Sequence, residues 1–132
     1  MEKSLEMFLE NNNNRPVTSF YERLADIKER VDFEYICEGD KPLAHECCLI
    51  ICEVLTQSRA EVVRISGEDI DGDMVREIFA SLTRDHIEHV IENYKNVKTE
   101  IKRKKQYLRS ALYNAFFELE AAVVNGVKCA FG

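Results

Sequence analysis

Basic residues are concentrated between Lys95 and Arg109, where seven of the eighteen lysines and arginines of this 132-residue chain fall. Glu100 is the only acidic residue among them, so this window carries a formal charge of +6, whereas the rest of the chain (11 basic and 23 acidic residues) carries −12. Such a cluster attracts phosphates locally, because salt screens distant charges beyond about 10 Å. The residues expected to neutralise phosphates are Lys95, Lys98, Lys102, Arg103, Lys104, Lys105 and Arg109.

The same window is predicted to begin a long helix that continues to about Val124. Apolar residues recur at spacings of 7, 4, 3, 4 and 3, at Ile101, Leu108, Leu112, Ala115, Leu119 and Ala122. Five of the basic residues recur at spacings of 3 and 4, at Lys95, Lys98, Lys102, Lys105 and Arg109. On one continuous helix the basic stripe would lie roughly 80° from the apolar stripe, so the helix would pack by one edge and present cations beside it. A solvated helix face without a ligand would give the same pattern.

Three further segments have the apolar spacing of helices that pack by one face, at residues 19–30, 71–82 and 83–94. Each begins with a serine, aspartate or threonine, residue types that cap helix N-termini. Between Leu43 and Leu55 the apolar residues are too dense for a single face, which indicates a helix at the centre of the core. Leu112 is expected to be buried against this central helix.

The sequence therefore predicts a mainly α fold, a compact helical domain of about five helices with a short β-hairpin near residues 61–70. Alternating residues in Val62-Val-Arg-Ile65, followed by Ser-Gly, indicate the hairpin. Four successive asparagines and Pro16 disfavour regular structure, so residues 1–16 are interpreted as an N-terminal tail or linker. Residues 17–132 are interpreted as a single helical domain.

The composition is that of an ordinary globular protein, with 45% hydrophobic and 32% charged residues. No run approaches the ~18 apolar residues that span a bilayer, and the acidic N-terminus does not resemble a signal peptide. We therefore expect a cytoplasmic protein without a membrane partner. The cysteines are five, an odd number that fits a reducing compartment rather than a disulfide framework: Cys37, Cys47, Cys48, Cys52 and Cys129. The three that lie together in an apolar run, Cys47, Cys48 and Cys52, are interpreted as buried structural thiols.

The sequence contains little that indicates a metal site or a catalytic site. His45, Cys48 and Cys52 could share a helix face, which leaves open a small metal-sensing domain, but the zinc-knuckle CxxC spacing is absent. His86 and His89 are three residues apart and are interpreted as exposed helical histidines. None of the common nucleophile, metalloprotease, phosphate-loop or dinucleotide motifs occurs. We therefore predict neither an enzyme nor a cofactor or metal site.

Four blocks of sequence, in this order, carry a resemblance to a known family: Val31-Asp-Phe-Glu-Tyr35, Val62-Val-Arg-Ile-Ser-Gly-Glu-Asp-Ile70, Leu82-Thr-Arg-Asp-His-Ile-Glu-His-Val90 and Gln106-Tyr-Leu-Arg-Ser-Ala-Leu-Tyr-Asn-Ala115. In these blocks the chain resembles the C-terminal helical domain of replication-initiator A proteins, a domain of unknown function carried by plasmids and conjugative elements of Gram-positive bacteria. The resemblance covers roughly two-thirds of the chain. Because only about 16 residues precede the domain, we expect a stand-alone or truncated accessory module rather than a complete initiator.

That family is distantly similar to the C-terminal domain of the primosomal protein DnaD, which binds DNA through a Tyr-x-x-x-Ile-x-x-x-Trp helix. Tyr107 matches the first position, whereas Ala111 and Ala115 replace the Ile and the Trp. The resemblance implies a DNA-binding role for the helix. Tyr107 would either stack on an exposed base or pack within the fold.

Two functions follow as hypotheses. The first is a non-enzymatic accessory module for DNA replication of a mobile element, which binds single- or double-stranded DNA weakly and non-specifically. If five to seven phosphates are engaged, log K should fall against log salt with a slope of about −4 to −6. The alternative is a protein–protein adaptor that contacts a replication partner such as a helicase or loader. The sequence predicts no oligomeric state.

Overall fold

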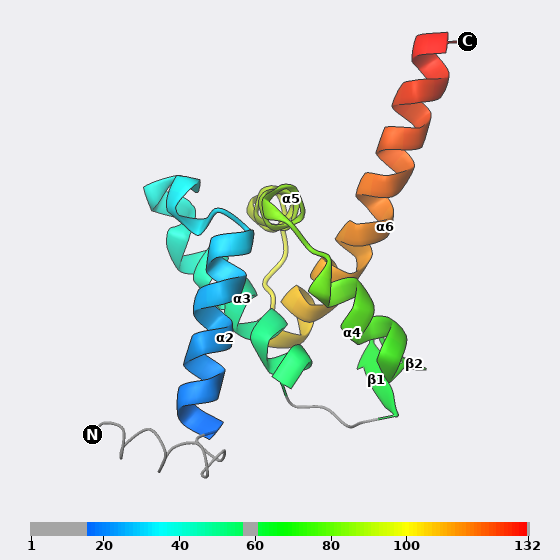
Figure 1. Cartoon of the computed structure of the whole chain (residues 1–132). Coiled ribbons are helices and arrows are strands. Elements are labelled where there is room, and N and C mark those ends of the chain that lie inside the picture. Colours follow the sequence, from blue (N-terminus) through cyan, green and yellow to red (C-terminus); the bar gives the residue numbers. More distant parts are fainter. Residues whose placement is uncertain (1–15, 57–60, 132) are drawn as a thin grey trace.

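Helices dominate the fold, as the sequence predicts. The computed structural model describes residues 16–56 and 61–131, with side chains for residues 20–56 and 61–121. Figure 1 shows the elements in chain order: α2 (Pro16–Arg30), the 3-10 helices η1 (Phe33–Tyr35) and η2 (Glu38–Asp40), α3 (Lys41–Thr56), β1 (Val62–Ile65), β2 (Glu68–Asp71), α4 (Gly72–Ala80), α5 (Arg84–Lys95) and α6 (Lys104–Phe131). These five α-helices and the hairpin confirm the predicted fold class for the described residues.

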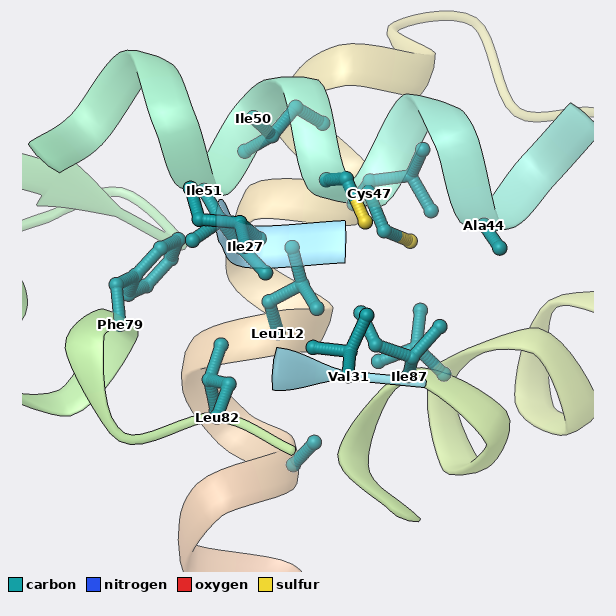
Figure 2. Close-up of a cluster of buried hydrophobic side chains, with 14 of the residues drawn as sticks. Ile27, Val31, Ala44, Cys47, Ile50, Ile51, Phe79, Leu82, Ile87 and Leu112 are labelled. Atoms are coloured by element: carbon teal, nitrogen blue, oxygen red, sulfur yellow. The ribbon is translucent and has the colours of Figure 1, made fainter. Parts of the chain in front are cut away.

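Helix α3 lies at the centre of the core. It packs against α2, α4, α5 and α6, and it buries Ala44, Cys47, Cys48, Ile50, Ile51 and Cys52. Figure 2 shows side chains from the surrounding elements converging beside it, among them Ile27, Val31, Phe79, Leu82, Ile87 and Leu112. Leu112 is completely buried, which confirms its predicted place in the core.

Local capping explains where several helices begin. Helix α2 starts at Pro16 rather than at Ser19, because proline suits the first turn of a helix, where its missing N–H is not needed. Asp71 caps α4 as predicted, and its Oδ2 accepts a hydrogen bond from the Met74 N–H at 3.1 Å. Thr83 is the N-cap of α5, and its backbone N–H donates to His86 Nδ1 at 2.9 Å.

The hairpin is a two-stranded antiparallel ribbon in which Arg64 lies opposite Asp69. Its turn residues, Ser66 and Gly67, have φ values of 54° and 83°. Positive φ at both central positions gives the twist that a two-residue hairpin requires, and glycine adopts it without strain. The Ser66 N–H donates to Ser110 Oγ at 3.1 Å, which ties the turn to α6.

One prediction is wrong, because the helix does not run continuously through the basic window. Helix α5 ends at Lys95, residues 96–103 are not helical, and α6 begins at Lys104. The apolar faces of α5 and α6 enter the same core, and the chain changes direction between the two helices (Figure 1). The intervening segment also contains Asn96, Val97 and Thr99, residues of low helix propensity.

Two remaining predictions concern the ends of the chain. The predicted N-terminal tail lies outside the described residues, apart from Pro16, which belongs to α2. At the other end, the predicted helix end near Val124 is wrong, because α6 continues to Phe131. Figure 1 shows its last turns extending beyond the other helices. No helix among the described residues is both long enough and apolar enough to cross a membrane.

Candidate nucleic-acid interface

Three of the predicted phosphate ligands form ion pairs within the protein. Lys95 Nζ lies 2.8 Å from Asp40 Oδ1, and this hydrogen bond raises the pKa of Lys95. Lys104 Nζ lies 3.1 Å from Glu46 Oε1 and, by the same cause, its pKa is raised. Lys105 Nζ lies 2.7 Å from Glu53 Oε2. These three cations are compensated by carboxylates, so each is a weaker phosphate ligand than the sequence predicts.

The other four predicted cations form no ion pair within the described residues: Lys98, Lys102, Arg103 and Arg109. Three of them lie in the segment 96–103, and Arg109 lies in the second turn of α6. With Glu100 also unpaired, this part of the window has four uncompensated basic residues and one acid, a net charge of +3. The predicted stripe on one helix is therefore replaced by a smaller basic surface shared by a loop and a helix start.

A groove of about 820 Å³ lies beside this surface. Its lining comes from the hairpin, the segment 96–103 and the first turns of α6: Arg64, Ser66, Gly67, Val97, Thr99, Glu100, Ile101, Arg103, Gln106, Tyr107, Arg109 and Ser110. The groove thus brings together two predicted cations, Arg103 and Arg109, with Arg64. Lys98 and Lys102 are exposed outside its lining.

Arg64 is the functional candidate that sequence reasoning missed. It lies in β1, far from the basic window in sequence, and its guanidinium Nη1 donates to Asp69 Oδ1 at 2.9 Å. The available signal was the alternation of Val62-Val-Arg-Ile65, which turns Arg64 and Ile65 to opposite faces of the hairpin. The sequence did not reveal which element that face would approach.

Tyr107 both packs and lines the groove. Its ring lies edge-on to Tyr94, with 5.9 Å between the ring centroids, and the side chain is half-buried. The alanines at the other two positions of the pattern considered from sequence do not line the groove, because Ala115 is completely buried in the core and Ala111 is half-buried against it. The groove lining therefore contains the tyrosine but no counterpart of the Ile or the Trp.

A second groove, of about 420 Å³, follows the opposite edge of α6. Its floor is apolar, with Phe20, Leu49, Ile50 and Leu108. The ion pairs of Lys104 with Glu46 and of Lys105 with Glu53 lie in the same lining. This surface has the apolar floor and charged rim that are typical of protein contacts.

The cysteines are mostly structural. Cys47, Cys48 and Cys52 are buried as predicted, whereas Cys37 is exposed and the Cys129 side chain lies outside the described residues. Burial raises the pKa of Cys47 to about 12 and that of Cys48 to about 11, so these thiols remain protonated. No cluster of His, Cys, Asp or Glu in the described part of the chain could hold a metal ion.

The two histidines of α5 have partners inside the fold. His89 Nε2 lies 2.7 Å from Glu118 Oε1 on α6, and His86 stacks on Phe116 with ring centroids 6.1 Å apart. Both side chains are half-buried rather than exposed as predicted. They connect α5 to α6.

A family model described as a family of unknown function (DUF6017) matches residues 13–128. The match includes both grooves and every residue of the basic window. No curated protein and no solved structure matches the chain.

Proposed function

We propose that this chain, which belongs to the DUF6017 family, is a non-enzymatic accessory module for DNA replication of a mobile element. It binds DNA weakly and without sequence preference through the basic surface formed by Lys98, Lys102, Arg103 and Arg109. The observation that carries this proposal is the absence of ion-pair partners for these four cations within the described residues, beside a groove that contains two of them. The replication context rests on the resemblance to replication-initiator A proteins.

Phosphates are the ligands that this surface suits. Arginine and lysine contacts to the DNA backbone supply affinity without reading the base sequence. The rest of the protein is acidic, and the overall net charge of −6 repels DNA at distances where the basic surface no longer attracts it. Weak, strongly salt-dependent binding is the expected result.

A salt titration of DNA binding tests the proposal directly. With three or four phosphates engaged, log K should fall against log salt with a slope of about −3 to −4 for a duplex. This slope is shallower than the sequence predicts, because three of the seven cations are compensated. Fluorescence anisotropy with a labelled duplex measures it, and no binding at about 50 mM salt would contradict the proposal.

A matched pair of variants separates local charge from total charge. Changing Lys98 and Lys102 to Glu reverses two exposed cations of the proposed surface, and changing Arg23 and Arg84 to Glu makes the same charge change on α2 and α5. Both variants should keep a helical circular dichroism spectrum, since surface substitutions usually alter stability by less than about 0.5 kcal/mol each. Of the four residues, Arg84 is the one that is partly buried, and it pairs with Glu88. Only the first should lose DNA binding; equal losses would point to net charge alone.

The second candidate function, a protein–protein adaptor, is favoured by the apolar groove along the other edge of α6. A partner helix from a replication helicase or loader would bury Phe20 and Leu49 there. A complex recovered from host lysate after nuclease treatment, and lost when Leu49 is changed to Glu, would support this function. The same complex lost on nuclease treatment would be bridged by DNA.

A further inference from the structure

We propose that the groove between the hairpin turn and α6 is a site for a single strand of DNA, and that Arg64 is one of its phosphate ligands. This inference rests on the proposed function and assigns it a specific substrate. Three arginines from two distant parts of the chain line the same groove: Arg64 from β1, Arg103 from the end of the segment 96–103, and Arg109 from the second turn of α6. Such convergence is not required by the packing of either element.

The arginines can bind phosphate without losing their present contacts. Arg64 is paired with Asp69 much as the three lysines are paired with carboxylates, but its guanidinium keeps a planar fork of donors that an ammonium lacks. Arg64 uses one guanidinium nitrogen, Nη1, for its bond to Asp69, and a guanidinium carries five N–H donors. Arg103 and Arg109 form no ion pair in the described part of the chain. The planar fork of arginine suits phosphate oxygens, which it can bind through two parallel hydrogen bonds.

Neutral donors in the lining complete a polar site. Ser110 Oγ accepts a hydrogen bond from the Ser66 N–H, so its own hydroxyl hydrogen is available to a phosphate oxygen. Thr99 and Gln106 add a hydroxyl and an amide to the lining. Glu100 is the acidic residue of the groove, and its carboxylate can accept hydrogen bonds from the exocyclic amino groups of bases.

The shape and the tyrosine favour a single strand over a duplex. A duplex keeps its base faces stacked inside, whereas a single strand can enter a groove and present base faces to an aromatic ring. Tyr107 supplies such a ring in the lining, with Arg103 and Arg109 in the same groove. The groove volume of about 820 Å³ lies within the ~300–1,000 Å³ typical of sites for organic ligands.

The two walls of the groove are joined by a hydrogen bond within the protein. The hydrogen bond from Ser66 to Ser110 holds the hairpin turn against α6, and the Arg64–Asp69 pair lies across the two strands. These contacts within the fold hold the hairpin turn and Arg64 beside α6, which lowers the ordering cost on association.

The test compares Arg64→Gln with Arg84→Gln. Each substitution removes one positive charge and one ion pair, Arg64 with Asp69 in the hairpin and Arg84 with Glu88 at the start of α5. The probes are a labelled oligothymidylate of about 16 nucleotides and a duplex of the same length, at matched salt. Thermal melting of both variants establishes that each remains folded.

The parent protein should bind the single strand more tightly than the duplex. Arg64→Gln should weaken single-strand binding at least fivefold and make the salt slope shallower by about 0.7, because one phosphate contact is lost. Arg84→Gln should bind as the parent does. Tyr107→Leu should lower single-strand affinity about 5- to 150-fold while changing duplex affinity little, as expected for one stacked base.

Two results would overturn the inference and leave the proposed function intact: equal affinity for single strand and duplex, or Arg64→Gln binding as tightly as Arg84→Gln. If the parent binds neither probe at low salt, the proposed function fails together with the inference.

Discussion

Two grooves flank the first turns of α6, and they differ in how their charges are compensated. Along the edge that faces α3, Lys104 and Lys105 pair with Glu46 and Glu53 above an apolar floor. Along the edge that faces the hairpin, Arg103 and Arg109 lie in a polar groove and form no ion pair among the described residues. Residues adjacent in sequence thus belong to surfaces of opposite character.

The difference shows that a run of basic residues is not a single site. In Arg103-Lys-Lys105 the first residue faces one groove and the next two face the other. The carboxylates that pair with the lysines lie 58 and 52 residues earlier in the chain. Charge density along the sequence therefore overestimates the charge that the surface offers to a ligand.

The largest expected effect concerns the buried apolar stripe of α6. Leu112 is completely buried there, so Leu112→Ala should lower the free energy of unfolding by about 2–5 kcal/mol through lost contacts and a cavity. Denaturant unfolding measures this loss. DNA affinity, measured at a temperature where the variant is still folded, should match that of the parent.

If Leu112→Ala left the unfolding free energy unchanged, the stripe would not be core. If the folded variant lost DNA affinity, DNA binding would depend on the core packing of Leu112. The distinction between a structural edge and a binding edge of α6 would then be wrong.

The next prediction compares double variants on the two edges of α6. Arg103→Glu with Arg109→Glu should weaken DNA binding at least tenfold, about 1.4 kcal/mol, with little change in stability. Lys104→Ala with Lys105→Ala should leave DNA affinity nearly unchanged, because these lysines already have carboxylate partners. The double variant should lose a little stability, since exposed ion pairs contribute at most about 1 kcal/mol each. Anisotropy and thermal melting at two salt concentrations measure both quantities. Equal losses of DNA affinity in the two double variants would show that the edges are equivalent.

The sequence predicted the helices well, because apolar spacing and capping residues are local signals. The central helix, the hairpin and the burial of Leu112 all agree with that reading. The break at residues 96–103 was missed, because lysine and arginine at spacings of 3 and 4 imitate a helical stripe even where the chain turns. At the candidate site, local charge found Arg103 and Arg109, but Arg64 required knowledge of tertiary proximity.

The smallest expected effect is that the stability of the protein changes with pH while its DNA affinity does not. His86 is half-buried, stacks on Phe116, and accepts a hydrogen bond at Nδ1 from the Thr83 N–H. Burial lowers the pKa of His86, and a protonated ring could not accept that bond. The unfolded chain therefore takes up the proton at a higher pH, near about 6.5, than the folded protein does. Its contribution to the unfolding free energy is complete above this pH and declines as the pH falls through the unfolded value toward the folded one.

His86→Gln removes the titration and keeps a side-chain oxygen that can accept the Thr83 bond, since glutamine suits this third helical position. The thermal midpoint of the parent should fall more steeply between pH 7.5 and 5.5, roughly one unit on either side of the histidine reference value, than that of His86→Gln. DNA affinity of the folded parent should stay level over the same range, because the cations of the proposed surface are arginines and lysines, residue types that remain charged there. Parallel pH profiles for the two proteins would remove His86 as the cause. A DNA affinity that changed with pH while the fold stayed intact would contradict this prediction. It would mean that the binding surface includes a titrating group in addition to its arginines and lysines.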